Sequence, residues 1–152
     1  MRFLTDDGLF GFILTPSTGS GMYRFQLVIN GKLVGDREPC FLESAMRSLG
    51  SLHELVDSRL RRIFVDAGSV MDIIESDDSL HDAALLQVAE SLDGWKLRGY
   101  VYEGNATFLA AGYMSGSDDM TNPISVSVVP LVEYDSVFGA AHDYWARTRR
   151  GK

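Results

Sequence analysis

This chain of 152 residues has one cysteine, no long apolar run and no N-terminal pattern typical of a signal peptide. Cys40 is the only cysteine, so no disulfide can form within the chain, and a disulfide-stabilised scaffold is excluded. No apolar run approaches the roughly 20 residues that a membrane-spanning helix needs. The N-terminus is acidic where a signal peptide would be apolar. We therefore expect a single cytoplasmic domain over residues 1–152 with no membrane partner.

Positive charge is also in short supply. The chain has 14 Lys and Arg against 21 Asp and Glu, which gives a net charge of −7. Binding to a phosphate backbone requires clustered Lys and Arg, so we expect no nucleic-acid partner. An acidic surface suits a basic protein partner instead, because opposite charge speeds the encounter.

Recognisable catalytic and metal-binding motifs are missing as well. His53, His81 and His142 have no second ligand at the spacing of a zinc site. Cys40 is expected to be a small, partly buried thiol. We therefore predict no enzymatic activity, no catalytic residues, no metal and no cofactor. Two alternatives stay open: a small cytoplasmic enzyme with a dispersed site, built for example from Asp36, Cys40 and a histidine, and a non-catalytic adaptor domain.

What the chain does contain is a clear hairpin over residues 22–36. One side of its first strand carries the large apolar residues Tyr23, Phe25, Leu27 and Ile29. This alternation is typical of a half-buried strand. Asn30-Gly31 follows, and this pair favours a type I′ turn because both of its residues must adopt a positive φ. The segment therefore predicts two antiparallel strands joined at Asn30-Gly31.

Periodicity over the rest of the chain divides it into further strands and helices. An apolar run predicts a strand over residues 9–14, and period two predicts strands over 95–102 and 124–128. Residues 107–114 are apolar on both faces, which predicts a return strand that is central in its sheet. Apolar spacings of three and four predict helices over residues 41–60, 66–75, 79–92 and 134–145. Gly50 and Ser51 are candidates for a bend or interruption in the first, and the third opens with a sequence at Ser79 that resembles a capping box with Asp in place of Glu. The order predicts an α+β fold: a mainly antiparallel sheet of about six strands in two meanders, packed with helices.

Acidic residues occur in pairs, at positions 6–7, 77–78 and 118–119, and none of these pairs fits a calcium loop. The third pair is followed by Met120, and methionine adapts well at interfaces. We predict that a partner contacts Asp118, Asp119 and Met120 first, and Asp77 and Asp78 second.

The hairpin resembles that of a family of bacterial immunity proteins, which are encoded beside polymorphic or contact-dependent toxins and share an "inG…iGD" hairpin, an acidic stretch and a helix. The resemblance is carried by Tyr23-Arg24-Phe25, Val28-Ile29-Asn30-Gly31-Lys32, Val34-Gly35-Asp36 and Phe41-Leu42-Glu43-Ser44. Gly94-Trp95 and residues 131–137 are similar to the closing strand and helix of that family. The resemblance implies a cytoplasmic, non-enzymatic protein that binds one cognate toxin domain, expected to be basic, and blocks it.

Overall fold

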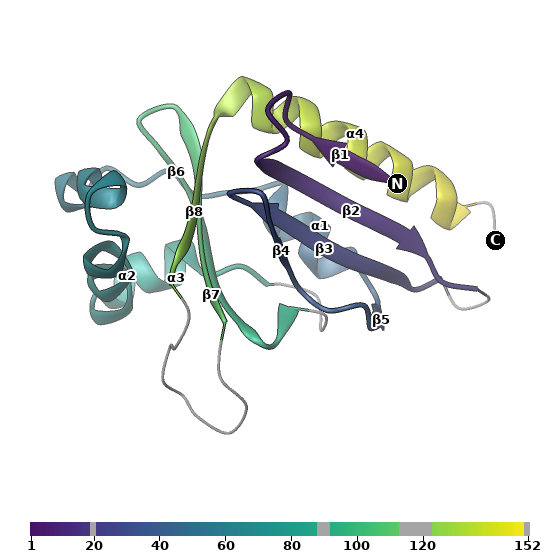
Figure 1. The fold of residues 1–152 in the computed structure, drawn as a ribbon, viewed down its shortest axis with the longest axis horizontal. Helices are drawn as coiled ribbons and strands as arrows, with labels where there is room; N and C mark the ends of the chain where they lie inside the picture. Colours follow the sequence, from purple (N-terminus) through teal and green to yellow (C-terminus); the bar gives the residue numbers. More distant parts are fainter. Residues whose placement is uncertain (19–20, 88–91, 113–122, 151–152) are drawn as a thin grey trace.

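The structure is a computed structural model that describes residues 1–18, 21–87, 92–112 and 123–150. Over these ranges eight strands form two antiparallel sheets, and five helical segments pack against them (Figure 1). The predicted α+β class with mainly antiparallel pairing is confirmed. The strands divide between a five-stranded sheet, sheet A, and a three-stranded sheet, sheet B.

Sheet A is built from the N-terminal third of the chain. Its strands are β1 (Arg2–Leu4), β2 (Phe10–Pro16), β3 (Tyr23–Ile29), β4 (Lys32–Val34) and β5 (Pro39–Cys40). The first four pair in chain order, and β5 pairs with β3 beyond the end of β4. Two of these strands, β1 and β5, are too short to show a periodic pattern, and the sequence does not predict them.

The predicted hairpin is β3 and β4. Asn30 has φ 50° and Gly31 φ 73°, so both turn residues have the positive φ that a type I′ turn needs. The predicted apolar face is buried throughout, since Tyr23, Phe25, Leu27 and Ile29 are each at most 2% exposed. Turn chemistry and side-chain alternation together set the register of the two strands.

Sheet B consists of β6 (Trp95–Tyr102), β7 (Asn105–Gly112) and β8 (Ser125–Pro130), in that order. β7 is the central strand, as predicted, and β8 is an edge strand that ends at Pro130. Alternate residues of these strands pack into two different cores, because sheet B is covered on both faces. One core lies between the two sheets, and the other lies under the helical segments of residues 58–84.

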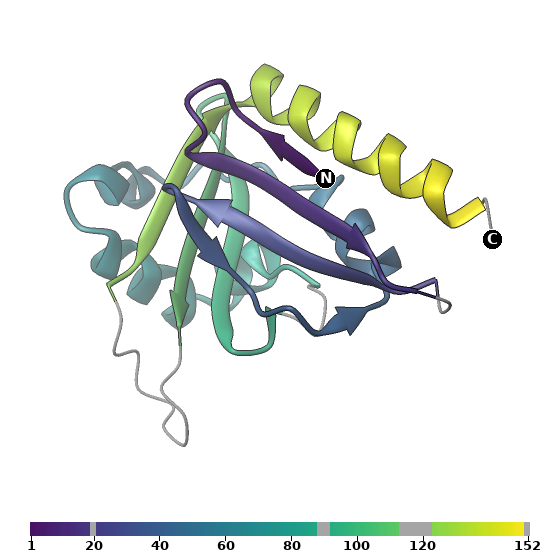
Figure 2. The same cartoon turned by 45° about the vertical axis from the view of Figure 1, so that its right-hand side comes forward.

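The helical segments are α1 (Glu43–Leu49), the 3₁₀ helix η1 (Ser58–Phe64), α2 (Ala67–Ser76), α3 (Asp78–Ala84) and α4 (Leu131–Arg150). Sheet B stands between sheet A on one side and η1, α2 and α3 on the other (Figures 1 and 2). α4 runs along β1 and β2 (Figure 2). None of the helices in the described ranges combines the length and apolar character needed to cross a bilayer.

Three aromatic rings join the two sheets to α4. Phe10 on β2 stacks on Phe108 of β7, with ring centroids 4.9 Å apart. Tyr134 of α4 lies 5.8 Å from Phe10 and 5.6 Å from Phe108. The Tyr134 hydroxyl donates a 2.6 Å hydrogen bond to the carbonyl oxygen of Leu49, at the end of α1. One cluster therefore connects sheet A, sheet B and two helices.

Residues 41–60 do not form one continuous helix, and the break falls at Gly50, one of the two residues named as a candidate interruption. α1 ends at Leu49, and the chain after it runs along the edge of β6 instead. There the Leu55 N–H donates to the Val101 carbonyl and the Val101 N–H to the His53 carbonyl, both at 2.8 Å. These backbone groups bond to the strand edge, whereas in a helix they would bond within their own segment. Apolar spacing alone does not reveal whether backbone groups bond within a helix or to the edge of a neighbouring strand.

The helix predicted over residues 79–92 is also shorter than expected. α3 ends at Ala84, and Leu85 forms an antiparallel bridge with Arg98 of β6. The helix is capped by Asp77 and not by a box at Ser79, because the Asp77 carboxylate accepts the backbone N–H groups of Ser79 and Leu80. Residues 88–91 of the predicted helix lie outside the described ranges.

Replacement of Gly31 by Val tests the turn. A β-branched residue at φ 73° is strained, so we expect Gly31→Val to lower the free energy of unfolding by about 1–2 kcal/mol. Gly31→Asn is the matched control, because asparagine adopts positive φ more readily, and its loss should be smaller. Urea unfolding measures both, and equal midpoints for the Val variant and the wild type would contradict the turn geometry.

Candidate functional site

The first predicted contact lies outside the described ranges. Asp118, Asp119 and Met120 all fall within residues 113–122, of which the structure gives no description. These residues join β7 to β8 along the chain. β8 is therefore the first described strand after the predicted contact residues in the sequence.

The second predicted contact, Asp77-Asp78, is described, and its two carboxylates have different surroundings. Asp77 caps α3, and its second carboxylate oxygen lies 3.3 Å from Nη2 of Arg59. Asp78 is exposed in the first turn of α3. The Asp77 carboxylate thus serves the fold, while Asp78 is the residue of the pair that a partner reaches without disturbing a cap.

Cys40 and the histidines that could form a dispersed enzymatic site lie in different parts of the structure. Cys40 is buried at 1% exposure, and its thiol donates a 3.3 Å hydrogen bond to the Tyr23 carbonyl. His53 and His142 line two separate hollows, each of about 290 Å³, and Cys40 lines neither. Among the described residues, no three His, Cys, Asp or Glu side chains come together in a group that could hold a metal ion.

A partly buried ion pair lies under α2 and α3. Arg98 of β6 is 8% exposed, and its Nη2 lies 2.7 Å from Oε1 of Glu75 and 3.3 Å from Nε2 of His81. Lys96 lies 3.3 Å from the other oxygen of Glu75. Since removal of one partner of a buried pair is costly, this network holds α2 against sheet B. Its charges are directed at one another, which favours a structural role.

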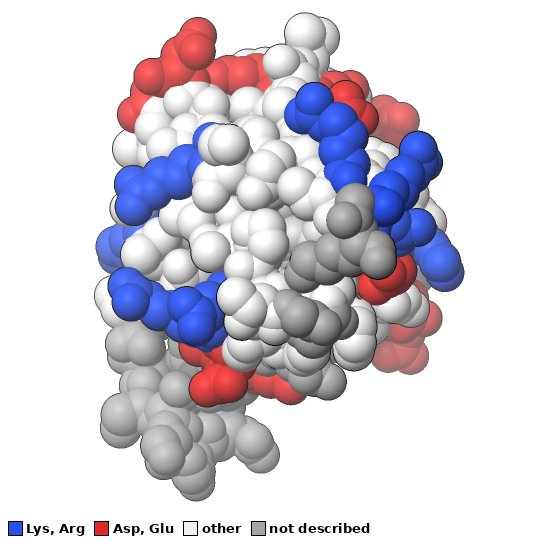
Figure 3. Space-filling model, turned by 90° about the vertical axis from the view of Figure 1, so that its right-hand side faces the viewer, with Lys and Arg blue, Asp and Glu red and all other residues white. Residues whose placement is uncertain are grey.

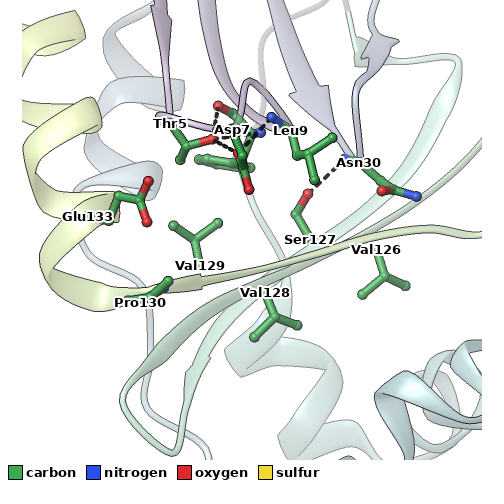
Figure 4. Close-up of a pocket in the computed structure, with 11 residues that line it drawn as sticks. Thr5, Asp7, Leu9, Asn30, Val126, Ser127, Val128, Val129, Pro130 and Glu133 are labelled. Carbon is green, nitrogen blue, oxygen red and sulfur yellow. Dashed lines mark hydrogen bonds between the residues drawn. The ribbon is translucent and has the colours of Figure 1, made fainter.

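An acidic hollow of about 130 Å³ lies where α4 begins (Figure 4). The turn between β1 and β2, the turn between β3 and β4, strand β8 and the first turn of α4 form its walls. Its lining residues are Thr5, Asp7, Leu9, Phe10, Asn30, Val126, Ser127, Val128, Val129, Pro130 and Glu133. Two of these residues are carboxylates, and none is Lys or Arg.

Asp7 retains its negative charge because local hydrogen bonds favour the ionised form. The Thr5 hydroxyl donates to Oδ1 of Asp7 at 2.6 Å, and the Leu9 N–H donates to the same oxygen at 2.9 Å. These two bonds, the first the larger in effect, hold the pKa of Asp7 below its ordinary value. The second carboxylate of the hollow is that of Glu133, in the first turn of α4 (Figure 4).

An apolar groove of about 390 Å³ lies next to the acidic hollow. Its lining residues are Asn30, Ile63, Phe64, Val65, Ala67, Ile124, Val126 and Val128. Phe64 is 78% exposed and Val65 is 90% exposed, which is unusual for large apolar side chains gathered at one place. Asn30, Val126 and Val128 line both depressions. We call the acidic hollow and the apolar groove together the β8 face.

Charge is unevenly distributed along α4. Its last turn carries Arg147, Arg149 and Arg150, whereas Glu133 lies in its first turn, beside the acidic hollow. Figure 3 shows the end of the molecule where α4 finishes, with Lys and Arg side chains on both sides of an uncharged central area. A basic partner is therefore attracted to the first turn of α4 and repelled at the last.

Sequence reasoning did not single out Glu133, Phe64 or Val65 as site residues. Glu133 is one acidic residue in a helical pattern, and only the fold brings it near Asp7. Phe64 and Val65 did carry a signal, because they are adjacent apolar residues that belong to no amphipathic stripe. An apolar pair of this kind indicates either a turn packed on the core or a contact surface.

A pair of variants separates the structural from the exposed aspartate. Asp77→Ala removes the cap of α3, so we expect the free energy of unfolding to fall by about 1 kcal/mol. Asp78→Ala removes only an exposed charge in the first turn, and we expect a loss of at most about 0.5 kcal/mol. Urea unfolding at neutral pH measures both, and the opposite order of stability would contradict the assigned cap.

Comparison with protein-family models, with curated proteins and with solved structures finds no match for this chain.

Proposed function

We propose that this chain is an immunity protein that binds a cognate bacterial toxin domain in the cytoplasm and blocks it by protein–protein contact. The observation that carries the proposal is the β8 face, where an acidic hollow adjoins a groove with exposed Phe64 and Val65. Interfaces between proteins typically combine exposed aromatic anchors with polar groups around them.

The hairpin supports the more specific part of the proposal. The segment that resembles the immunity family forms β3, the Asn30-Gly31 turn and β4, and α1 follows it. The same turn also lines the β8 face through Asn30. The resembling segment therefore lies at the candidate contact surface as well as in the core.

The net charge of −7 agrees with a basic toxin domain as partner. Opposite net charges accelerate association, and salt screens this effect over a distance of about 10 Å at 0.1 M. The predicted acidic contacts at Asp118, Asp119 and Asp78 would add to the same attraction.

Co-expression with the toxin domain encoded by the neighbouring gene tests this function. We expect the wild-type protein to restore growth of cells that produce the toxin domain, and the two purified proteins to form a complex. The association rate constant should fall as the salt concentration rises, because screening weakens the long-range attraction. Growth rescue and stopped-flow or surface-binding kinetics are the measurements.

Failure of the wild type to bind or protect against any product of an adjacent gene would overturn the proposed function. The predicted contact is tested separately with Asp118→Lys/Asp119→Lys. Loss of protection by a variant that still folds supports this contact, and full protection removes these two residues from the interface.

A further inference from the structure

We propose that the β8 face takes up two neighbouring side chains of its partner, a Lys or Arg in the acidic hollow and a large apolar side chain in the apolar groove. The inference rests on the proposed function, since it specifies the residues that the toxin domain presents at this surface.

The acidic hollow has the size and charge for one cationic head group. Its volume of about 130 Å³ is below the roughly 300–1,000 Å³ of small-molecule sites, and close to a cavity of about 150 Å³ that holds a single benzene ring. Asp7 on the β1–β2 turn and Glu133 in the first turn of α4 supply two carboxylates to its lining (Figure 4). A guanidinium group carries five donors in a planar fork that matches carboxylates, and an ammonium group carries three.

The two carboxylates of the hollow differ in how firmly their orientation is held. Oδ1 of Asp7 already accepts the Thr5 hydroxyl and the Leu9 N–H, which fix the orientation of the carboxylate. Glu133 accepts a long contact, at 3.4 Å, from the Asp6 N–H. A cation that enters the hollow therefore meets one carboxylate orientated by two hydrogen bonds and a second with a long contact to the backbone.

The apolar groove provides the second contact. Phe64 and Val65 lie at the end of η1, with exposures of 78% and 90%. Val126 and Val128 of β8 line the same groove, so a side chain between them and Phe64 contacts apolar groups on both sides. Burial of an exposed aromatic side chain at the centre of an interface is a common source of binding energy.

The two depressions are held at a fixed separation. The Asn30 N–H donates a 2.8 Å hydrogen bond to Oγ of Ser127, which is 6% exposed. This bond attaches the β3–β4 turn to β8, and Asn30 lines both depressions. The wall between the hollow and the groove is therefore formed before the partner arrives, which lowers the entropic cost of binding.

A protein fits this combination better than other classes of partner. Phosphate groups are repelled by Asp7 and Glu133, which excludes a nucleic-acid backbone from the hollow. A single small cation would occupy the hollow and leave Phe64 and Val65 exposed. A folded domain that presents a basic residue next to an apolar one covers both depressions at once.

The test uses the purified full chain and the toxin domain encoded by the neighbouring gene. The two test variants are Glu133→Lys in the hollow and Phe64→Ser in the groove. Asp143→Lys is the control for charge, because it makes the same change on α4 at a side chain that is 78% exposed. Phe41→Ser is the control for the loss of an aromatic ring, since Phe41 is 63% exposed and lines neither depression.

We expect each test variant to raise the dissociation constant by about tenfold or more, and each control to change it by no more than about threefold. Thermal unfolding of the four variants is the check that each variant is folded. Glu133→Lys should also regain affinity for a toxin domain in which one basic interface residue is changed to Glu, because the charges are then exchanged.

The outcomes separate the inference from the function on which it rests. If the wild type binds and protects, while Glu133→Lys and Phe64→Ser bind as tightly as their controls, the β8 face is not the contact surface and only the inference is overturned. If the wild type neither binds nor protects, the proposed function fails and the inference fails with it.

Discussion

Contact between Phe10, Phe108 and Tyr134 is the interaction on which the arrangement of the two sheets depends. Each ring comes from a different element, and each residue is at most 2% exposed. Burial raises the pKa of Tyr134, so its hydroxyl stays neutral and donates to the Leu49 carbonyl at the end of α1. The cluster thereby places the first turn of α4 beside the β1–β2 turn, which is what brings Glu133 and Asp7 to the same hollow.

Much of the fold could be predicted from the sequence where local chemistry and burial agree. The hairpin at Asn30-Gly31, the central position of β7 and the helix over α2 all follow from turn residues and periodicity. Predictions failed where backbone groups bond to a neighbouring strand. Residues 53–55 bond to Val101 of β6 and Leu85 bridges to Arg98 of the same strand, and these pairings interrupt patterns that otherwise favour helix.

The candidate site was much less predictable than the fold. The carboxylates of Asp7 and Glu133 are separated by most of the chain, and no spacing rule relates them. Asp77 was predicted as a contact, yet its carboxylate caps a helix, which is the ordinary use of an aspartate at such a position. Acidic composition predicted a surplus of negative charge, but the location of the charges depends on how α4 crosses the N-terminal strands.

The Asn30-Gly31 turn has two structural roles, so a substitution there affects both at once. Its backbone geometry sets the β3–β4 register, and its Asn30 N–H bonds to Ser127 and forms a wall shared by the hollow and the groove. Change at this position would disturb folding, whereas Leu9, Phe64 and Val65 are largely exposed and contribute little to either core. If the β8 face is the contact surface, substitutions at Phe64 and Val65 would change the choice of partner while the wall formed by Asn30 and Ser127 stays constant.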